Sequence, residues 1–142
     1  MNQRGFATLE VILMVMVIGI LASIAVPRFT SVTAAANTAK IQADRSTIDT
    51  AIAIYVMEGN TISSDTTDIS VLKDYINDVD NLEPPTGKCY MNDKDDPQDI
   101  PKEKYKITKP DGETEYRATL NGKTASYFTK KASSTNNAGD NG

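Results

Sequence analysis

The sequence contains no histidine, no tryptophan and a single cysteine, Cys89. Imidazole acid–base catalysis and histidine-ligated metal sites are therefore excluded. One cysteine allows neither an intrachain disulfide nor a multi-cysteine metal site. No constellation of residues supports catalysis, so we predict that the protein is not an enzyme and needs no cofactor. Cys89 is expected to be a small buried side chain, with an intermolecular disulfide or a reactive thiol as alternatives.

Aromatic side chains are also scarce, at 6% of the 142 residues, and the chain has no overall excess of positive charge. Its net charge is -4 at pH 7, with acids in excess from residue 59 to 101 and bases in excess from residue 102 to 131. Nucleic-acid-binding proteins usually carry a basic excess interleaved with aromatic residues. Nucleic acid is therefore not the expected partner, although DNA binding through a few contacts stays open.

The apolar residues that the chain does have are concentrated near its start. Residues 6–26 (FATLEVILMVMVIGILASIAV) form an apolar run in which Glu10 is the only charge. About 20 residues with a rise of 1.5 Å each are enough to cross a bilayer as a helix. Arg4 precedes the run and predicts that the N-terminus stays in the cytoplasm while the following part is exported.

The same run could also be a secretory signal peptide, a plain single-pass anchor or the buried helix of a soluble protein. A signal peptide usually has an apolar core of about 7 to 15 residues, which is shorter than this run. The possible cleavage sites also lie directly before Pro27. None of the three accounts for Glu10, because a carboxylate inside a membrane is costly and normally marks function.

A short polar leader ends in glycine, and a phenylalanine and then a glutamate follow before the rest of the apolar run. Residues 5–10 (GFATLE) resemble the class III signal peptide of type IV pilins and of the pseudopilins of type II secretion and competence systems. The resemblance covers about a fifth of the chain, from Met1 to about Phe29. The combination of leader, Gly-Phe junction, glutamate and apolar helix is specific.

The resemblance implies a maturation step and a role for the charge in the apolar run. A membrane-embedded prepilin peptidase would cut between Gly5 and Phe6, and the new amino group of Phe6 would be N-methylated. Glu10 would then pair with the Phe6 ammonium of a neighbouring subunit during filament assembly. Removal of Glu10 would leave that ammonium without a counter-charge, at a cost of about 3–5 kcal/mol.

Gly19 and Pro27 are residues that weaken a helix. Glycine has a low helix propensity, and proline lacks the N–H and crowds the carbonyl four residues earlier. Both fall where the N-terminal helix of pilins commonly has such residues, which implies a segment that bends or melts during assembly. A tolerated kink at the membrane edge is the alternative.

We predict an α+β, pilin-like fold with a long N-terminal helix from about residue 6 to residue 58. Its second half carries small and apolar residues at spacings of three to five, and this face is expected to pack on the exported domain. Gly59 and Asn60 supply the stop signal. The residues of the predicted face are Val32, Ala36, Ala39, Ala43, Ile48, Ala51, Ile52 and Tyr55.

After the helix, the pattern predicts a short helix at 69–76, capped by Asp68, and then a small antiparallel sheet. The sheet is a meander of three or four strands packed on the C-terminal half of the long helix. Alternating residues on both sides of Asn121-Gly122 indicate a hairpin there. The expected strands are 88–91, 105–109, 114–120 and 123–129.

These elements divide the chain into four predicted parts. They are a leader at 1–5, a transmembrane or filament-core half of the helix at 6–27, a globular domain at 28–131 that includes the amphipathic half, and a disordered tail at 132–142.

An acidic segment (NDKDDPQD, residues 92–99) precedes a basic one. Pseudopilins of type II secretion carry calcium in roughly this region, and carboxylates suit that ion. The spacing does not fit an EF-hand, so a solvated loop is favoured and no metal is predicted. The candidate calcium ligands are Asp93, Asp95, Asp96 and Asp99. The lysines that would contact a neighbour's acidic loop in a filament are Lys102, Lys104, Lys106 and Lys109.

The resemblance thus implies a structural subunit that polymerises with copies of itself on a pilus assembly platform in the cytoplasmic or inner membrane. The precursor would be held in that membrane, and the assembled filament would lie outside the cell, at its surface. Adhesion, motility and DNA uptake are not distinguished. A pseudopilin is the alternative within the family, and an uncleaved single-pass anchored binding domain is the alternative from another class.

Overall fold

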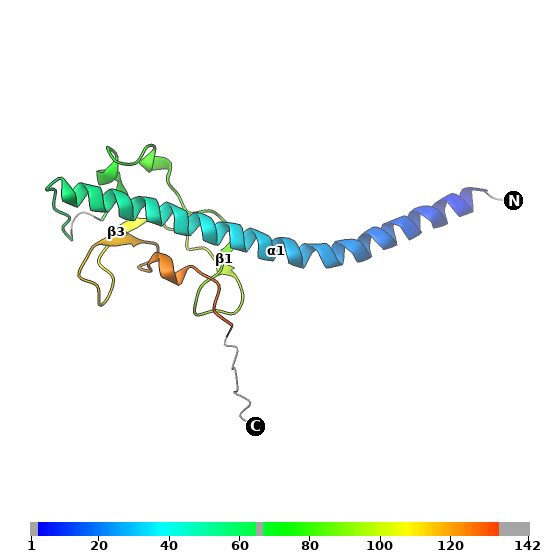
Figure 1. Ribbon diagram of the computed structural model, residues 1–142. Coiled ribbons are helices and arrows are strands. Elements are labelled where there is room, and N and C mark those ends of the chain that lie inside the picture. Colours follow the sequence, from blue (N-terminus) through cyan, green and yellow to red (C-terminus); the bar gives the residue numbers. More distant parts are fainter. Residues whose placement is uncertain (1–2, 65–66, 134–142) are drawn as a thin grey trace, which may run out of the picture. The chain divides into compact units, whose positions relative to one another are not determined.

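The computed structural model describes residues 3–64 and 67–133. The chain divides into two compact units, residues 1–33 and 34–142, and the helix α1 contributes to both. The first two leader residues and the predicted tail from residue 134 onward lie outside the described residues. The elements, with η for a 3₁₀ helix, are α1 (Gln3–Met57), η1 (Ile69–Leu72), η2 (Val79–Asn81), β1 (Lys88–Cys89), β2 (Gln98–Asp99), β3 (Lys106–Thr108), β4 (Arg117–Thr119) and η3 (Ala125–Tyr127) (Figure 1).

The helix α1 runs for 55 residues and begins inside the predicted leader. It ends one residue before the predicted boundary. Gly59 takes a left-handed conformation with φ of 90°, which an L side chain rarely adopts. The Gly59 and Asn60 amides donate to the carbonyls of Val56 and Tyr55, at 3.0 and 3.3 Å. The predicted stop signal is confirmed.

The predicted buried face of α1 is confirmed at Ile48, Ala51 and Ile52, and Tyr55 is partly buried, but the prediction is wrong for the residues before them. The predicted Val32 is 66% exposed, and Ala36, Ala39 and Ala43 are exposed as well. The sequence offers two possible stripes, and alanine buries too little apolar area to choose between them. The buried stripe consists of Ala34, Thr38, Ile41, Arg45, Ile48, Ala51 and Ile52.

The two polar residues of this stripe find partners on other elements. The Thr38 hydroxyl accepts a hydrogen bond from the Tyr90 amide at 2.8 Å. Arg45 reaches backbone carbonyls, as described below. A buried polar group costs little once it is hydrogen-bonded. Thr38 and Arg45 can therefore lie on a buried face whose other residues are apolar.

The α+β class and the long helix are confirmed, but the strands form two separate antiparallel pairs in place of one meander. In one pair Lys88 lies opposite Asp99 and Cys89 opposite Gln98. In the other, the central positions are Ile107 and Ala118. Strand β2 lies in the segment that was expected to be an acidic loop.

The segment 123–129 was predicted to be a strand and is not one. Around Asn121-Gly122, where both residues have positive φ, a single bridge joins Leu120 to Lys123. The chain then forms η3, and Phe128 is fully buried. Gln42 of α1 donates to the Phe128 carbonyl at 2.6 Å. Packing against α1 thus replaces strand pairing for this segment.

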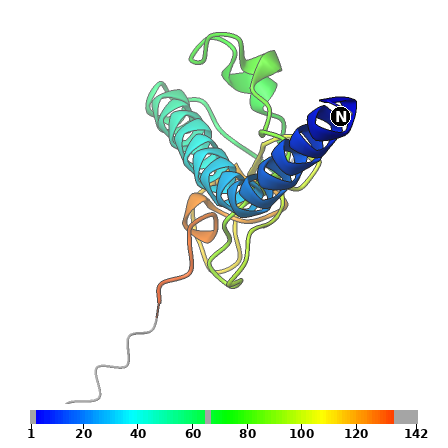
Figure 2. The same cartoon turned by 90° about the vertical axis from the view of Figure 1, so that its right-hand side faces the viewer.

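The core of the unit 34–133 forms between α1 and the segments that follow it. In both views the η1–η2 segment, in green, and η3, in orange, lie on different sides of the second half of α1 (Figures 1 and 2). The largest fully buried apolar side chains include Leu72, Tyr105 and Phe128. Cys89 is free and fully buried, which confirms the prediction of a small buried side chain.

The predicted short helix after α1 is present but shorter. It appears as η1, and the Asp68 carboxylate accepts from the Ser70 amide at 2.8 Å, as an N-cap should. This hydrogen bond lowers the pKa of Asp68 below its usual value. The Asp68 cap is confirmed.

Candidate functional site

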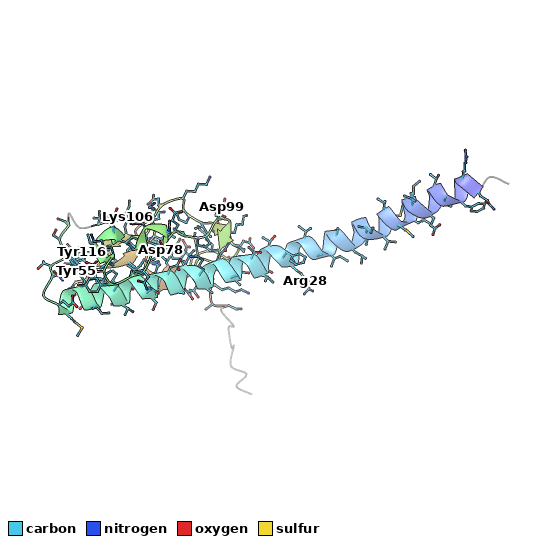
Figure 3. All side chains as sticks on the ribbon, turned by 90° about the horizontal axis from the view of Figure 1, so that it is seen from above. Arg28, Tyr55, Asp78, Asp99, Lys106 and Tyr116 are labelled. Carbon is cyan, nitrogen blue, oxygen red and sulfur yellow. The ribbon has the colours of Figure 1, made fainter. Side chains whose placement is uncertain are left out.

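The first part of α1 presents an apolar surface on all sides. The helix is long and apolar enough to cross a membrane, with a mean hydropathy of 2.7 in its most apolar window and none of that window buried. Large side chains such as Phe6, Leu13 and Ile18 are 75%, 52% and 64% exposed. Figure 3 shows side chains projecting from the ribbon along this part of the helix. Within the described part of the chain, nothing covers this surface.

Glu10 is the only charge in this surface, and its side chain is exposed. No ion pair or hydrogen bond joins its carboxylate to any described residue. The nearest polar side chain along the helix, Thr8, donates to the Arg4 carbonyl at 3.0 Å and so satisfies itself locally. Glu10 is therefore a carboxylate in an apolar setting whose partner, if it has one, must come from outside the described chain.

The predicted cleavage junction, Gly5-Phe6, lies within helical backbone near the start of α1. A Cβ atom added at Gly5 would meet nothing within 4 Å, so packing does not require glycine there. Glycine does make the helix easier to unwind, by about 1 kcal/mol relative to alanine.

The helix continues through both predicted weak points. Gly19 and Pro27 lie inside α1, which has no break between Gln3 and Met57. The Gly19 position is open, with nothing within 4 Å of an added Cβ. The missing N–H of Pro27 leaves one carbonyl of the preceding turn without its helical donor.

A second cluster of functional interest lies in the second half of α1. It was not predicted from the sequence. Arg45 is fully buried, and its Nη2 donates to the carbonyls of Ala118, at 2.5 Å, and Lys123. Asp49, one turn further along α1, accepts from the Ala118 amide at 2.7 Å. Both backbone groups of Ala118 on the outer edge of β4 are thus held by side chains of α1.

The opposite edge of this strand pair is also occupied. The Ile107 amide of β3 donates to the Thr67 carbonyl at 2.8 Å, and Asp68 forms a bridge with Lys106. An open strand edge is a template for pairing with another chain. Because α1 and the segment at 67–68 take up both edges, this pair is closed to further strands.

Burial shifts the pKa values of both charged groups in this cluster. It lowers the pKa of Arg45 to about 10, against the attraction of Asp49 and the Tyr105 oxygen. Burial also raises the pKa of Asp49, against the hydrogen bond from Ala118 and the positive charges of Arg117 and Arg45. The Arg45 Nε and Nη1 atoms have no hydrogen-bond partner in the described residues. The Phe128 ring lies 5.3 Å from the guanidinium and supplies a cation–π contact.

The four aspartates weighed as calcium ligands are all exposed and lie before strand β2 or within it. Lys131 approaches Asp95 at 3.0 Å, and Lys94 approaches Asp93 at 4.0 Å. Among the described residues, no group of three or more His, Cys, Asp or Glu side chains is placed to hold a metal ion.

The basic stretch after this loop is partly matched within the chain. Lys104 lies 3.4 Å from Glu83, and Lys106 lies 3.9 Å from Glu103. These pairs are exposed, so each contributes little to stability. Lys102 and Lys109 are not paired with an acid within the described residues.

The buried Arg45 could have been suspected from one signal. It lies on the same helical face as Ile41 and Ile48, and the spacing to Asp49 is four. A charged pair on an apolar face indicates buried polar contacts. The identity of the contacts, more than 70 residues further along the chain, has no local signal.

Comparison with known proteins gives one similarity that bears on function. The chain is 37% identical over 62 residues to PilA5 of Thermus thermophilus, described as the major component of a type IV narrow pilus. The match covers 44% of this chain and 53% of the relative, so it spans about half the length of that protein. No protein-family model matches the chain, and no solved structure matches it. The long apolar N-terminal helix, the small antiparallel sheets and the similarity to a type IV pilin together are consistent with the pilin superfamily.

Proposed function

We propose that this protein is a structural subunit of a type IV pilus. The observation that carries the proposal is the first part of α1, which is apolar on every side, exposed, and interrupted by one carboxylate. Such a surface is buried either in a bilayer or against other helices. A filament subunit buries this surface in both ways, in the bilayer as a membrane-held precursor and against other helices in the polymer. The similarity to a pilus major component supports this role over that of a pseudopilin or an enzyme.

Maturation begins with cleavage by prepilin peptidase between Gly5 and Phe6, followed by N-methylation of Phe6. Gly5 makes the local unwinding of the helix easier. Before cleavage the charge of Arg4 holds the N-terminus in the cytoplasm, and the part that follows α1's apolar segment is exported. The platform that assembles the pilus lies in the same membrane.

Assembly pairs Glu10 with the methylated ammonium of Phe6 in a neighbouring copy. Each copy then supplies one carboxylate and one ammonium, so every buried charge has a partner in the filament. Because a buried charge without its partner is strongly unfavourable, the pair sets the register between neighbours. Gly19 and Pro27 allow the helix to bend as the subunit leaves the bilayer.

The test combines the mass of the mature chain with one variant. Protein sheared from the surface of native cells is expected to begin at methylated Phe6. Glu10→Ala is expected to abolish sheared filaments, since an unpaired ammonium costs about 3–5 kcal/mol per contact. Thr8→Ala, on the same segment, is the matched control and should assemble normally. An intact Met1 terminus that stays in the membrane would instead indicate an anchored binding domain.

A further inference from the structure

A groove lies where α1 ends within the unit 34–133. Its volume is about 500 Å³. Its apolar lining includes Ile52 and Ile62, which are 6% and 7% exposed, and Val56, which is 51% exposed. Tyr116, which is labelled in Figure 3, also lines the groove. The groove is large enough for an aromatic side chain and its neighbour.

The polar rim of this groove carries more negative than positive charge. Asp49 uses one carboxylate oxygen to accept from the Ala118 amide, and its other oxygen has no partner in the described residues. Arg117 is already matched, with its Nε 3.0 Å from Glu113 and its Nη2 4.0 Å from Glu115. The groove lining thus holds two carboxylates, Asp49 and Glu115, against the one guanidinium of Arg117, which lies closer to Glu113 than to Glu115.

The same chain carries a complementary segment on the first part of α1. Arg28 is the only charge between Glu10 and Lys40, it is exposed, and its guanidinium has no partner among the described residues. Figure 3 labels Arg28 on the helix. The next residue, Phe29, is 69% exposed. The unmatched cation complements the excess of carboxylates in the groove lining, and the exposed ring complements its apolar side chains.

We propose that Arg28 and Phe29 of a second copy of this chain occupy the groove. Phe29 covers Ile52, Ile62 and Val56, and Arg28 lies at the Asp49–Glu115 rim. The contact is heterologous, because a helix segment of one copy meets a groove of another, and such contacts generate an open helical polymer when the rotation between copies does not close a ring. This inference rests on the proposed filament function and names one lateral contact within it.

The first test uses cysteine cross-linking of the full chain in native cells. Phe29→Cys combined with Val56→Cys places one thiol on the helix segment and one at the groove wall. Since each copy would contact two different neighbours, oxidation is expected to give a ladder of dimers, trimers and higher multimers from sheared filaments. Cys89 is fully buried and does not compete. Each single variant should give no ladder.

The matched control pairs Phe29→Cys with Lys73→Cys, an exposed position outside the groove. Filaments that form without a ladder in the Phe29–Val56 variant overturn the inference and leave the groove to another occupant. An equal ladder in the control overturns it as well. If the unmodified chain forms no filaments at all, the proposed function fails, and the two failures are thereby distinguished.

A second test reverses the charges proposed to meet in the contact. It can be carried out even if the double-cysteine variant does not assemble. Arg28→Glu is expected to lower the ratio of sheared filament to membrane precursor by about tenfold, because two acids then meet at the rim. Adding Glu115→Lys should restore most of that ratio. Lys73→Glu is the control and should leave it unchanged. An unaltered ratio in Arg28→Glu, or no recovery in the double variant, contradicts the contact.

Discussion

The two parts of α1 differ in what covers them, and the difference does not follow hydropathy. In the first part Leu13 and Ile18 are more than half exposed, whereas in the second part the cation of Arg45 is fully buried. Burial requires a covering partner, which the sheets and loops of residues 60–133 supply to the second part. The described chain offers no partner to the first. A large apolar surface left uncovered in this way is suited to a bilayer or to further copies.

The largest effect is expected from removing the buried cation. Arg45→Ala leaves the Ala118 carbonyl without a donor, removes one of the two donors to the Lys123 carbonyl, and opens a cavity beside Phe128. We expect a loss of about 3–5 kcal/mol in the free energy of unfolding. Urea unfolding of the full chain in detergent micelles can be followed by tyrosine fluorescence, because the chain lacks tryptophan and all six tyrosines lie beyond residue 54.

The control for this variant is Lys40→Ala on the same helix. Lys40 is exposed and pairs with Asp44 at 2.5 Å. The Asp44 side chain is only 13% exposed, but an i,i+4 pair whose lysine reaches solvent contributes about 0.2–1 kcal/mol. Equal losses in the two variants would show that Arg45 contributes no more than a surface charge.

The same substitution made in each part of α1 tests directly whether the first part is uncovered and the second part is packed. Ile48 is fully buried and Ile18 is 64% exposed, and both lie in α1. Ile48→Ala is expected to cost about 2–5 kcal/mol of unfolding free energy. Ile18→Ala should change it by less than about 0.5 kcal/mol in the micelle-held monomer. A large loss from Ile18→Ala would mean that the first part of α1 is packed within the monomer after all.

The smallest effect concerns pH. Burial raises the pKa of the Cys89 thiol to about 11, from an ordinary value near 9. Between pH 9 and 10 the unfolded thiol loses its proton while the native thiol keeps it, so stability falls as pH rises. The fall should reach about 1 kcal/mol by pH 10.

Cys89→Ala should remove this part of the pH dependence while lowering stability at every pH through the lost volume. The readout is the midpoint of urea unfolding at pH 8, 9 and 10, compared between the two chains. Midpoints that decline in parallel would assign the alkaline loss to other groups. Tyr105 is one such group, since burial and its hydrogen bond to Asp44 raise its pKa as well.

Much of the fold could be predicted because its signals are local. The end of α1 follows from the left-handed conformation that Gly59 allows, and the cap of η1 follows from Asp68. Strands β1, β3 and β4 lie within the predicted strand segments. Strand β2 was missed because Gln98 and Asp99 pair with Cys89 and Lys88 without any apolar alternation of their own.

The sequence by itself determines a long helix with an apolar first part and one carboxylate in it, because helix propensity and hydropathy act over neighbouring residues. The choice of the buried face in the second part depends on the tertiary structure. Alanines on the exposed face bury too little area to compete, whereas Thr38 and Arg45 gain hydrogen bonds from segments 50 or more residues away. The same long-range packing draws Phe128 under α1 and thereby ends the sheet at β4.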